Sequence, residues 1–82
     1  MRTDGAWPED PLERLTQLVH DLRTPLTIVQ GFAELLSRGG AGLDEGRRSE
    51  FLARILNASQ EMKGILDDER EDRLAREDPP AG

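Results

Sequence analysis

The 82-residue sequence contains no cysteine and only one histidine. It therefore forms no disulfide and no thiolate metal site, and a single histidine argues against a zinc site built on histidines. No apolar run approaches the roughly 20 residues that a membrane-spanning helix needs. No signal peptide is visible either, because residues 1–4 lead into polar sequence. We therefore expect a cytoplasmic protein with no metal site and no contact with a membrane.

Acidic residues outnumber basic ones in this chain. There are 17 Asp and Glu against 11 Lys and Arg, which gives a net charge of −6. This excess argues against nucleic acid or an anionic membrane as the main partner, because both repel an acidic surface. The length allows one small domain, whose own core gives limited stability. Chains of this size often gain stability by forming oligomers.

The first helix signal begins at Asp10. Asp10 suits the N-cap, Pro11 suits the first helical position, and Glu13 can complete a capping box. Apolar residues then recur at alternating spacings of three and four, with further apolar residues beside them: Leu12, Leu15, Val19, Leu22, Leu26, Val29, Ala33 and Leu36, then Leu18, Ile28, Phe32 and Leu35. This heptad pattern predicts a helix over residues 11–38. We expect Gly39 or Gly40 to end it in the left-handed conformation.

A second helix is predicted over residues 45–72, with Asp44 as its N-cap. The connection over residues 40–43 is so short that the two helices must be antiparallel neighbours. One apolar row recurs at spacings of four and three and a second row flanks it: Phe51, Ile55, Ala58, Met62 and Ile65, then Leu52, Leu56, Ser59 and Leu66. Beyond Leu66 the pattern gives way to a charge run over residues 67–73, which is typical of a solvated helix end.

These patterns predict an all-α fold, an antiparallel helical hairpin over residues 10–72. The apolar stripes are wider than one partner helix can cover, so we expect two copies to form a homodimer, a four-helix bundle. Residues 1–9 and 73–82 are predicted to be disordered tails, because they offer no periodic apolar pattern. Trp7 is the exception in the first tail, and it either docks on the end of the bundle or is exposed.

The only histidine opens the run His-Asp-Leu-Arg-Thr-Pro-Leu, residues 20–26. Residues three and four positions apart lie on one face of a helix, so Arg23 and Thr24 flank His20. Asp21 lies at the edge of the same patch. Pro25 has no backbone N–H, and its ring clashes with the Asp21 carbonyl, which predicts a kink in this turn. An imidazole beside a carboxylate that can accept its ring proton is a candidate nucleophile.

The same seven residues resemble the H-box of bacterial sensor histidine kinases. The resemblance falls in their dimerisation and histidine-phosphotransfer domain, and it extends through the apolar pattern of residues 12–68. It implies that His20 accepts the γ-phosphoryl group of ATP and passes it to an aspartate of a response-regulator receiver domain. It also implies that Asp21 is the general base and that Thr24 positions water when the regulator is dephosphorylated. Arg23 would stabilise phosphoryl charge.

Each of these residues also has a simpler interpretation. Arg23 could serve only as a surface ion-pair partner, and Thr24 could be a helix residue that merely precedes proline. The resemblance further implies that Thr27, Gly31 and Phe32 lie where regulators dock and so set partner choice. Phe32 is alternatively a plain core residue.

Sensor kinases also carry an ATP-binding domain after the second helix, and the sequence has no sign of one. The residues after Asp68 are charged or proline-rich. The glycines at 39, 40 and 42 connect two helices rather than follow a strand, so they do not form a nucleotide-binding loop. We therefore expect no cofactor in this chain, and ATP and Mg²⁺ would bind a separate domain, in cis in a parent protein or in trans.

Three alternatives stay open at this stage. The chain is either a fragment of a kinase or a stand-alone phosphotransfer protein, and enzyme activity of its own is uncertain. The other possibility is a non-catalytic dimerisation adaptor that only pairs chains or binds a response regulator. An adaptor would have no need of His20 beside Asp21 and Thr24, and this feature separates the two classes of function.

Overall fold

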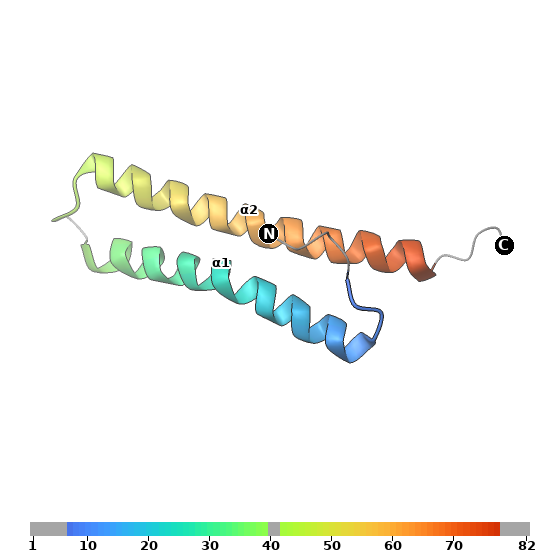
Figure 1. Ribbon diagram of the computed structural model, residues 1–82. Helices are drawn as coiled ribbons and strands as arrows, with labels where there is room; N and C mark the ends of the chain where they lie inside the picture. The colour runs from blue at the N-terminus through green and yellow to red at the C-terminus, as the bar shows by residue number, and fades with distance from the viewer. Residues whose placement is uncertain (1–6, 40–41, 78–82) are drawn as a thin grey trace.

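The computed structural model describes residues 7–39 and 42–77. Two α-helices make up this part of the chain: α1 spans Pro11–Gly39 and α2 spans Glu45–Glu77. The helices are antiparallel and lie side by side (Figure 1). This arrangement confirms the predicted all-α helical hairpin. Over the described residues, neither helix has an apolar stretch long enough to cross a membrane.

Both helices begin at the predicted N-caps. The Glu13 N–H donates to Oδ2 of Asp10 at 3.0 Å, and the Arg47 N–H donates to Oδ1 of Asp44 at 2.7 Å. Each bond satisfies one of the backbone donors that the first turn of a helix leaves without a partner. The two aspartates therefore fix where α1 and α2 start.

The end of α1 differs slightly from expectation. The helix continues to Gly39, which does not adopt the left-handed conformation, and the alternative, Gly40, lies outside the described residues. Glycine fits at position 39 for another reason, because a Cβ there would run into the Leu43 side chain. The absence of a side chain therefore lets the connection fold back closely onto the helix end.

The contact between the helices uses one row of residues from each. These rows are half-buried or buried: Arg14, Leu18, Leu22, Pro25, Val29, Phe32 and Leu36 of α1, then Arg48, Phe51, Ile55, Ala58, Met62, Ile65, Glu69 and Asp72 of α2. The ring centroids of Phe32 and Phe51 are 5.2 Å apart, which sets the register near the closed end. The predicted apolar seam of α1 is thus divided, because part of it faces α2 and part stays exposed on the chain.

Pro25 lies at the centre of this contact and is fully buried. The helix continues through it without interruption. Because proline has no N–H, the Asp21 carbonyl lacks its usual helical donor in this turn. The predicted kink itself stays a prediction.

The C-terminal boundary of α2 was predicted five residues too early. Residues 73–77 continue the helix, so the predicted tail over residues 73–82 is wrong for this part, and residues 78–82 lie outside the described ones. The charge run is not simply a solvated end either. Glu69 is only 9% exposed, and both Glu69 and Asp72 bind Arg14 of α1, at 2.8 and 2.6 Å. The partner of these acids lies far away in the sequence, which hid the contact from local pattern analysis.

The N-terminal segment is also ordered where it can be described. Trp7 is 2% exposed, so the alternative that it docks on the end of the hairpin is confirmed. Residues 7–10 cross from the start of α1 to α2 (Figure 1), and Arg76 donates to the Trp7 carbonyl at 3.1 Å. A disordered tail over residues 1–9 is therefore wrong for residues 7–9, and residues 1–6 lie outside the described part of the chain.

The ion pairs of Arg14 predict that the hairpin loses stability in acid. Hydrogen bonds from Arg14 lower the pKa of Glu69 and the pKa of Asp72. Because both folded-state values lie below the unfolded-state values of about 4, the unfolded chain takes up protons first as the pH falls. This contribution to the free energy of unfolding is therefore complete above about pH 5 and declines through pH 4 and below.

Urea unfolding, followed by circular dichroism from about pH 3 to about pH 7, measures this loss of stability. The matched variant is Arg14→Met, which keeps the side-chain length but cannot bind either carboxylate. We expect its free energy of unfolding to depend less steeply on pH in the acid range. Equal acid dependence in both proteins would contradict the assignment.

Candidate functional site

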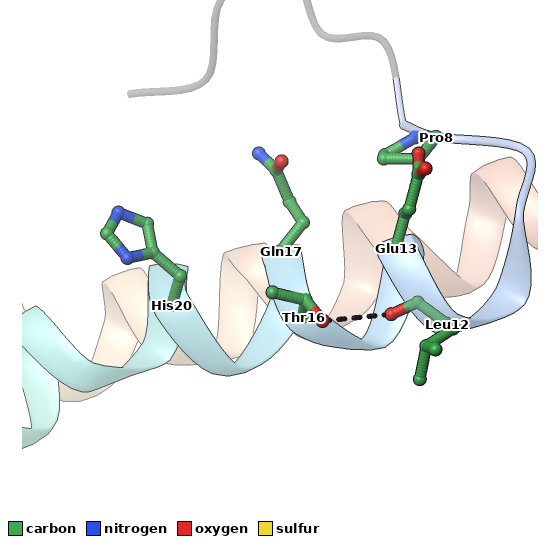
Figure 2. A pocket seen from close by; sticks show the side chains of 6 residues that line it. All are labelled: Pro8, Leu12, Glu13, Thr16, Gln17 and His20. Atoms are coloured by element: carbon green, nitrogen blue, oxygen red, sulfur yellow. Dashed lines mark hydrogen bonds between the residues drawn. The ribbon is translucent and has the colours of Figure 1, made fainter.

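The predicted phosphoacceptor residue His20 is exposed on the side of α1 that faces away from α2. Its side chain projects to the same side of α1 as Glu13, Gln17 and the Pro8 ring (Figure 2). A shallow hollow runs along this surface from the N-terminal segment to the histidine, and six residues line it: Pro8, Leu12, Glu13, Thr16, Gln17 and His20. The imidazole is therefore accessible to a large partner molecule as well as to a small one.

Asp21 lies next to His20 but points closer to the helix contact, and it is half-buried. Gln17, one turn earlier, donates from Nε2 to Oδ2 of Asp21 at 3.4 Å. The two residues are four positions apart, which places them on one face of a helix. Sequence analysis missed Gln17, although its amide and its spacing from Asp21 were signals that could have identified it. The contact orients the carboxylate that stands beside the histidine.

The exposed surface of α1 continues beyond His20 as a stripe along the helix. Thr24, Thr27 and Gly31 are all exposed and follow His20 at spacings of four, three and four. We call these four residues, 20, 24, 27 and 31, the histidine stripe. Arg23 is exposed beside it. The structure thus brings together most of the residues that the sequence assigned to phosphoryl chemistry and to partner contact, and all come from α1.

Gly31 has open space around it, since no heavy atom lies within 4 Å of where a Cβ would be. Nothing within the hairpin therefore requires glycine at this position. Its lack of a side chain leaves a flat place in the stripe, which supports the predicted role in contact with a partner rather than a role in packing.

Phe32 combines the two interpretations that the sequence left open. It is half-buried, and its ring packs at an interplanar angle of 48° against Phe51 of α2. The Arg54 guanidinium lies 5.9 Å from the centroid of the Phe32 ring, and Arg54 also pairs with Glu50 at 3.7 Å. The core interpretation therefore holds for one edge of Phe32. The sequence did not reveal that Arg54 lies beside Phe32, because this proximity depends on the pairing of the helices.

No metal site accompanies the histidine in the described part of the chain, where no group of three acidic or histidine side chains is arranged to hold a metal ion. The arrangement presents an accessible imidazole that can act as a nucleophile, a neighbouring carboxylate that can act as a base, and a hydroxyl one turn further on.

The family comparison decides the identity of this arrangement. The model of the His Kinase A (phospho-acceptor) domain matches residues 12–72, which is most of the chain and includes the whole histidine stripe. The chain belongs to this family. Membership supports the role of a histidine phosphoacceptor and dimerisation domain of two-component kinases. No curated protein and no solved structure matches the chain.

The exposure of the histidine stripe predicts that its chemistry can be removed without loss of the fold. His20→Gln and Thr24→Ala should each change the free energy of unfolding by less than about 0.5 kcal/mol, as is usual for surface substitutions. Ala58→Asp is the contrasting variant, because Ala58 is 4% exposed and an unpaired carboxylate there costs several kcal/mol. Urea unfolding at about pH 7 compares the stability of the three variants. Destabilisation by His20→Gln as large as that by Ala58→Asp would refute this prediction.

Proposed function

We propose that His20 is the phosphoacceptor of a two-component phosphorelay and passes its phosphoryl group to an aspartate of a response-regulator receiver domain. The observation that carries the proposal is the exposed His20, with Asp21 beside it and Thr24 one turn further on, in a chain of the phospho-acceptor family. This position lets both a phosphoryl donor and an acceptor domain reach the same ring nitrogen.

The transfer requires one nucleophile and one base. A ring nitrogen of His20 attacks the γ-phosphorus of ATP, the bond from phosphorus to the ADP oxygen breaks, and Asp21 accepts the proton from the ring. In the second step a carboxylate oxygen of the receiver attacks the same phosphorus and the P–N bond breaks. The contact from Gln17 supports the role of Asp21, because it restrains the carboxylate of the residue that follows His20.

Two further residues of this surface fit later steps of the relay. Thr24 supplies a hydroxyl that can hold a water molecule when the receiver loses its phosphoryl group. Arg23 supplies a positive charge for the phosphoryl oxygens, since arginine binds such groups through several N–H donors. We assign receiver contact to Thr27, Gly31 and the exposed edge of Phe32, together with Arg54 of α2.

ATP and Mg²⁺ would bind a separate kinase domain, either in cis in a longer protein or in trans. The proposal follows the sequence, in which the glycines at 39, 40 and 42 lie between two helices rather than after a strand. On this proposal the hairpin is the substrate of phosphorylation and does not phosphorylate itself. The second candidate, a dimerisation adaptor that binds a regulator without chemistry, is the outcome of the test if labelling fails.

His20→Gln should abolish phosphorylation, because glutamine has a similar size and polarity but no nucleophilic ring nitrogen. The assay supplies the ATP-binding domain of a sensor histidine kinase in trans, with γ-labelled ATP, and measures acid-labile, base-stable label on the chain. Asp21→Asn should slow labelling by about a hundredfold or more, as expected for loss of a general base. Thr24→Ala is the matched control and should be labelled as fast as the original chain.

The same donor also separates the two candidate functions. Label that accumulates equally in the His20→Gln protein would overturn the phosphoacceptor assignment. A chain that is folded, binds a receiver domain and still takes no label from kinase domain or phosphorylated receiver would favour the adaptor.

We also propose that the functional form is a homodimer that buries the apolar rows left exposed on one chain. These side chains remain between 42% and 71% exposed: Leu12, Leu15, Val19 and Leu26 of α1, and Leu52, Leu56 and Leu66 of α2. So large an apolar surface on a small chain is characteristic of an interface. A second copy is the simplest partner, because two hairpins with such rows complete a four-helix bundle.

The positions of the two rows support this pairing. Leu26 follows the buried Pro25, and Leu66 follows the buried Ile65, so each exposed row lies about 100° beyond the row that faces the other helix. Because the helices run in opposite directions, equal rotations turn both rows toward the same side of the hairpin. Thr24, one residue before Pro25, lies on the other side. Dimerisation through the apolar side would therefore leave the histidine stripe accessible.

Leu26→Asp should shift the chain from dimer to monomer. The substitution would bury an unpaired carboxylate in the proposed interface, which costs several kcal/mol. The matched control is Leu35→Asp, because the Leu35 side chain is 47% exposed and that of Leu26 is 42% exposed. Leu35 lies one residue before Leu36 of the row that faces α2, and therefore on the side of the histidine stripe. Sedimentation at tens of micromolar measures both. A folded monomer of the unmodified chain at that concentration would contradict the proposal.

A further inference from the structure

The short segment before α1 is attached to both helices. We call residues 7–9 the strap. Trp7 is 2% exposed, and the Arg14 guanidinium lies 5.5 Å from the centroid of its ring. Arg14 of α1 also donates to the Pro8 carbonyl at 3.0 Å, and Arg76 of α2 donates to the Trp7 carbonyl at 3.1 Å. Two consecutive carbonyls of the strap are thus held by arginines of different helices.

Arg14 links the strap to the C-terminal part of α2. Its Nε donates to Oε2 of Glu69 at 2.8 Å, and its Nη2 donates to Oδ2 of Asp72 at 2.6 Å. The third nitrogen, Nη1, makes the bond to Pro8. The side chain is only 11% exposed, so these charge-assisted bonds lie in a place where water competes weakly.

Arg76 forms the second attachment, near the last turn of α2. Besides the Trp7 carbonyl, it contacts Asp72 at 2.9 Å through Nε and Glu9 at 3.3 Å through Nη1. Asp72 therefore accepts from both arginines. The strap is thus attached to α2 directly by Arg76, and indirectly by Arg14 of α1, which binds Glu69 and Asp72.

This part of α2 has little else to hold it against α1. Leu66 and Leu74 are the only large apolar residues over positions 66–77, and they remain 47% and 43% exposed. A helix end without an apolar face frays readily, because most helical stability in proteins comes from tertiary packing. Besides the pairs within α2 that join Arg73 to Glu69 and Arg76 to Asp72, the contacts with Arg14 and the strap order these turns against α1.

The strap cannot become an extension of α1. Pro8 disfavours helical backbone at Trp7, and Asp10 caps the helix that Pro11 begins. The segment therefore has two available arrangements, docked against both helices or detached from them. It does not have a graded series of helical intermediates.

We propose that the strap is a detachable conformational device that couples the chain entering α1 to the C-terminal turns of α2. When it is docked, residues 69–77 are ordered against α1. When it is lifted, by a pull or a rotation of the residues before Trp7, the attachments of Arg14 and Arg76 are lost and these turns loosen together. The proposal does not depend on the phosphoryl chemistry of His20, and it is tested without it.

The test uses Trp7 as its own reporter, since the chain has one tryptophan. Arg76→Gln removes one attachment at a position that is 38% exposed, so the hairpin stays folded. We expect Trp7 emission to shift to longer wavelength and acrylamide quenching to increase. The converse variant, Trp7→Ala, should raise hydrogen exchange of the amides of residues 70–77 by about tenfold, which corresponds to one lost charge-assisted hydrogen bond. Exchange over residues 52–62 should stay unchanged.

Arg54→Gln is the matched control. It also removes an arginine that lies over an aromatic ring and pairs with an acid, but near the closed end of the hairpin. Neither Trp7 emission nor exchange at residues 70–77 should change in it. Unchanged emission in Arg76→Gln would overturn the proposal. So would a uniform rise in exchange along both helices of Trp7→Ala, because it would indicate general destabilisation instead of local coupling.

Discussion

Two helices can cover only one row of each other, and the remainder of this structure depends on that constraint. The row of α1 through Pro25 and the row of α2 through Ala58 face each other along the hairpin. The remaining surfaces of the two helices are not covered by this contact. One side keeps Leu26 and Leu66 exposed, the surface of α1 that faces away from α2 carries His20, and the open end is held by the arginine at position 14. The contact between the helices thus leaves an apolar row and the histidine stripe on different surfaces of the molecule.

Much of this arrangement could be predicted, because helical periodicity is a local property. Asp10 and Asp44 marked the starts of both helices, and the apolar row from Phe51 to Ile65, recognised from its spacing, is the row of α2 that the hairpin buries. The prediction failed where the stabilising partner is distant. The acids of the charge run contact Arg14, 55 and 58 residues away, so their burial and the five extra helical residues were not visible locally.

In the candidate site, too, local features could be predicted from the sequence and contacts between the helices could not. His20, Arg23 and Thr24 could be placed on one face from spacing alone, and all three are exposed. The position of Phe32 could not be decided, since it depends on Phe51 and Arg54 of the other helix. Sequence patterns also could not show how the apolar seam of α1 is shared. Spacing defines a stripe, but only the pairing of the helices decides which edge of it is covered.

The separation of the two sides has a consequence for how such a protein can change over time. The histidine stripe shares no residue with the exposed row that contains Leu26, Leu52 and Leu66, and the two occupy different surfaces of the hairpin. If the stripe recognises a receiver and the apolar row joins two copies, as we propose, substitutions that alter receiver recognition would leave self-association intact, and the reverse also holds. A two-fold pair would present one stripe on each outer surface. Related chains in one cell could diverge independently in the regulator they address and in the subunit with which they pair.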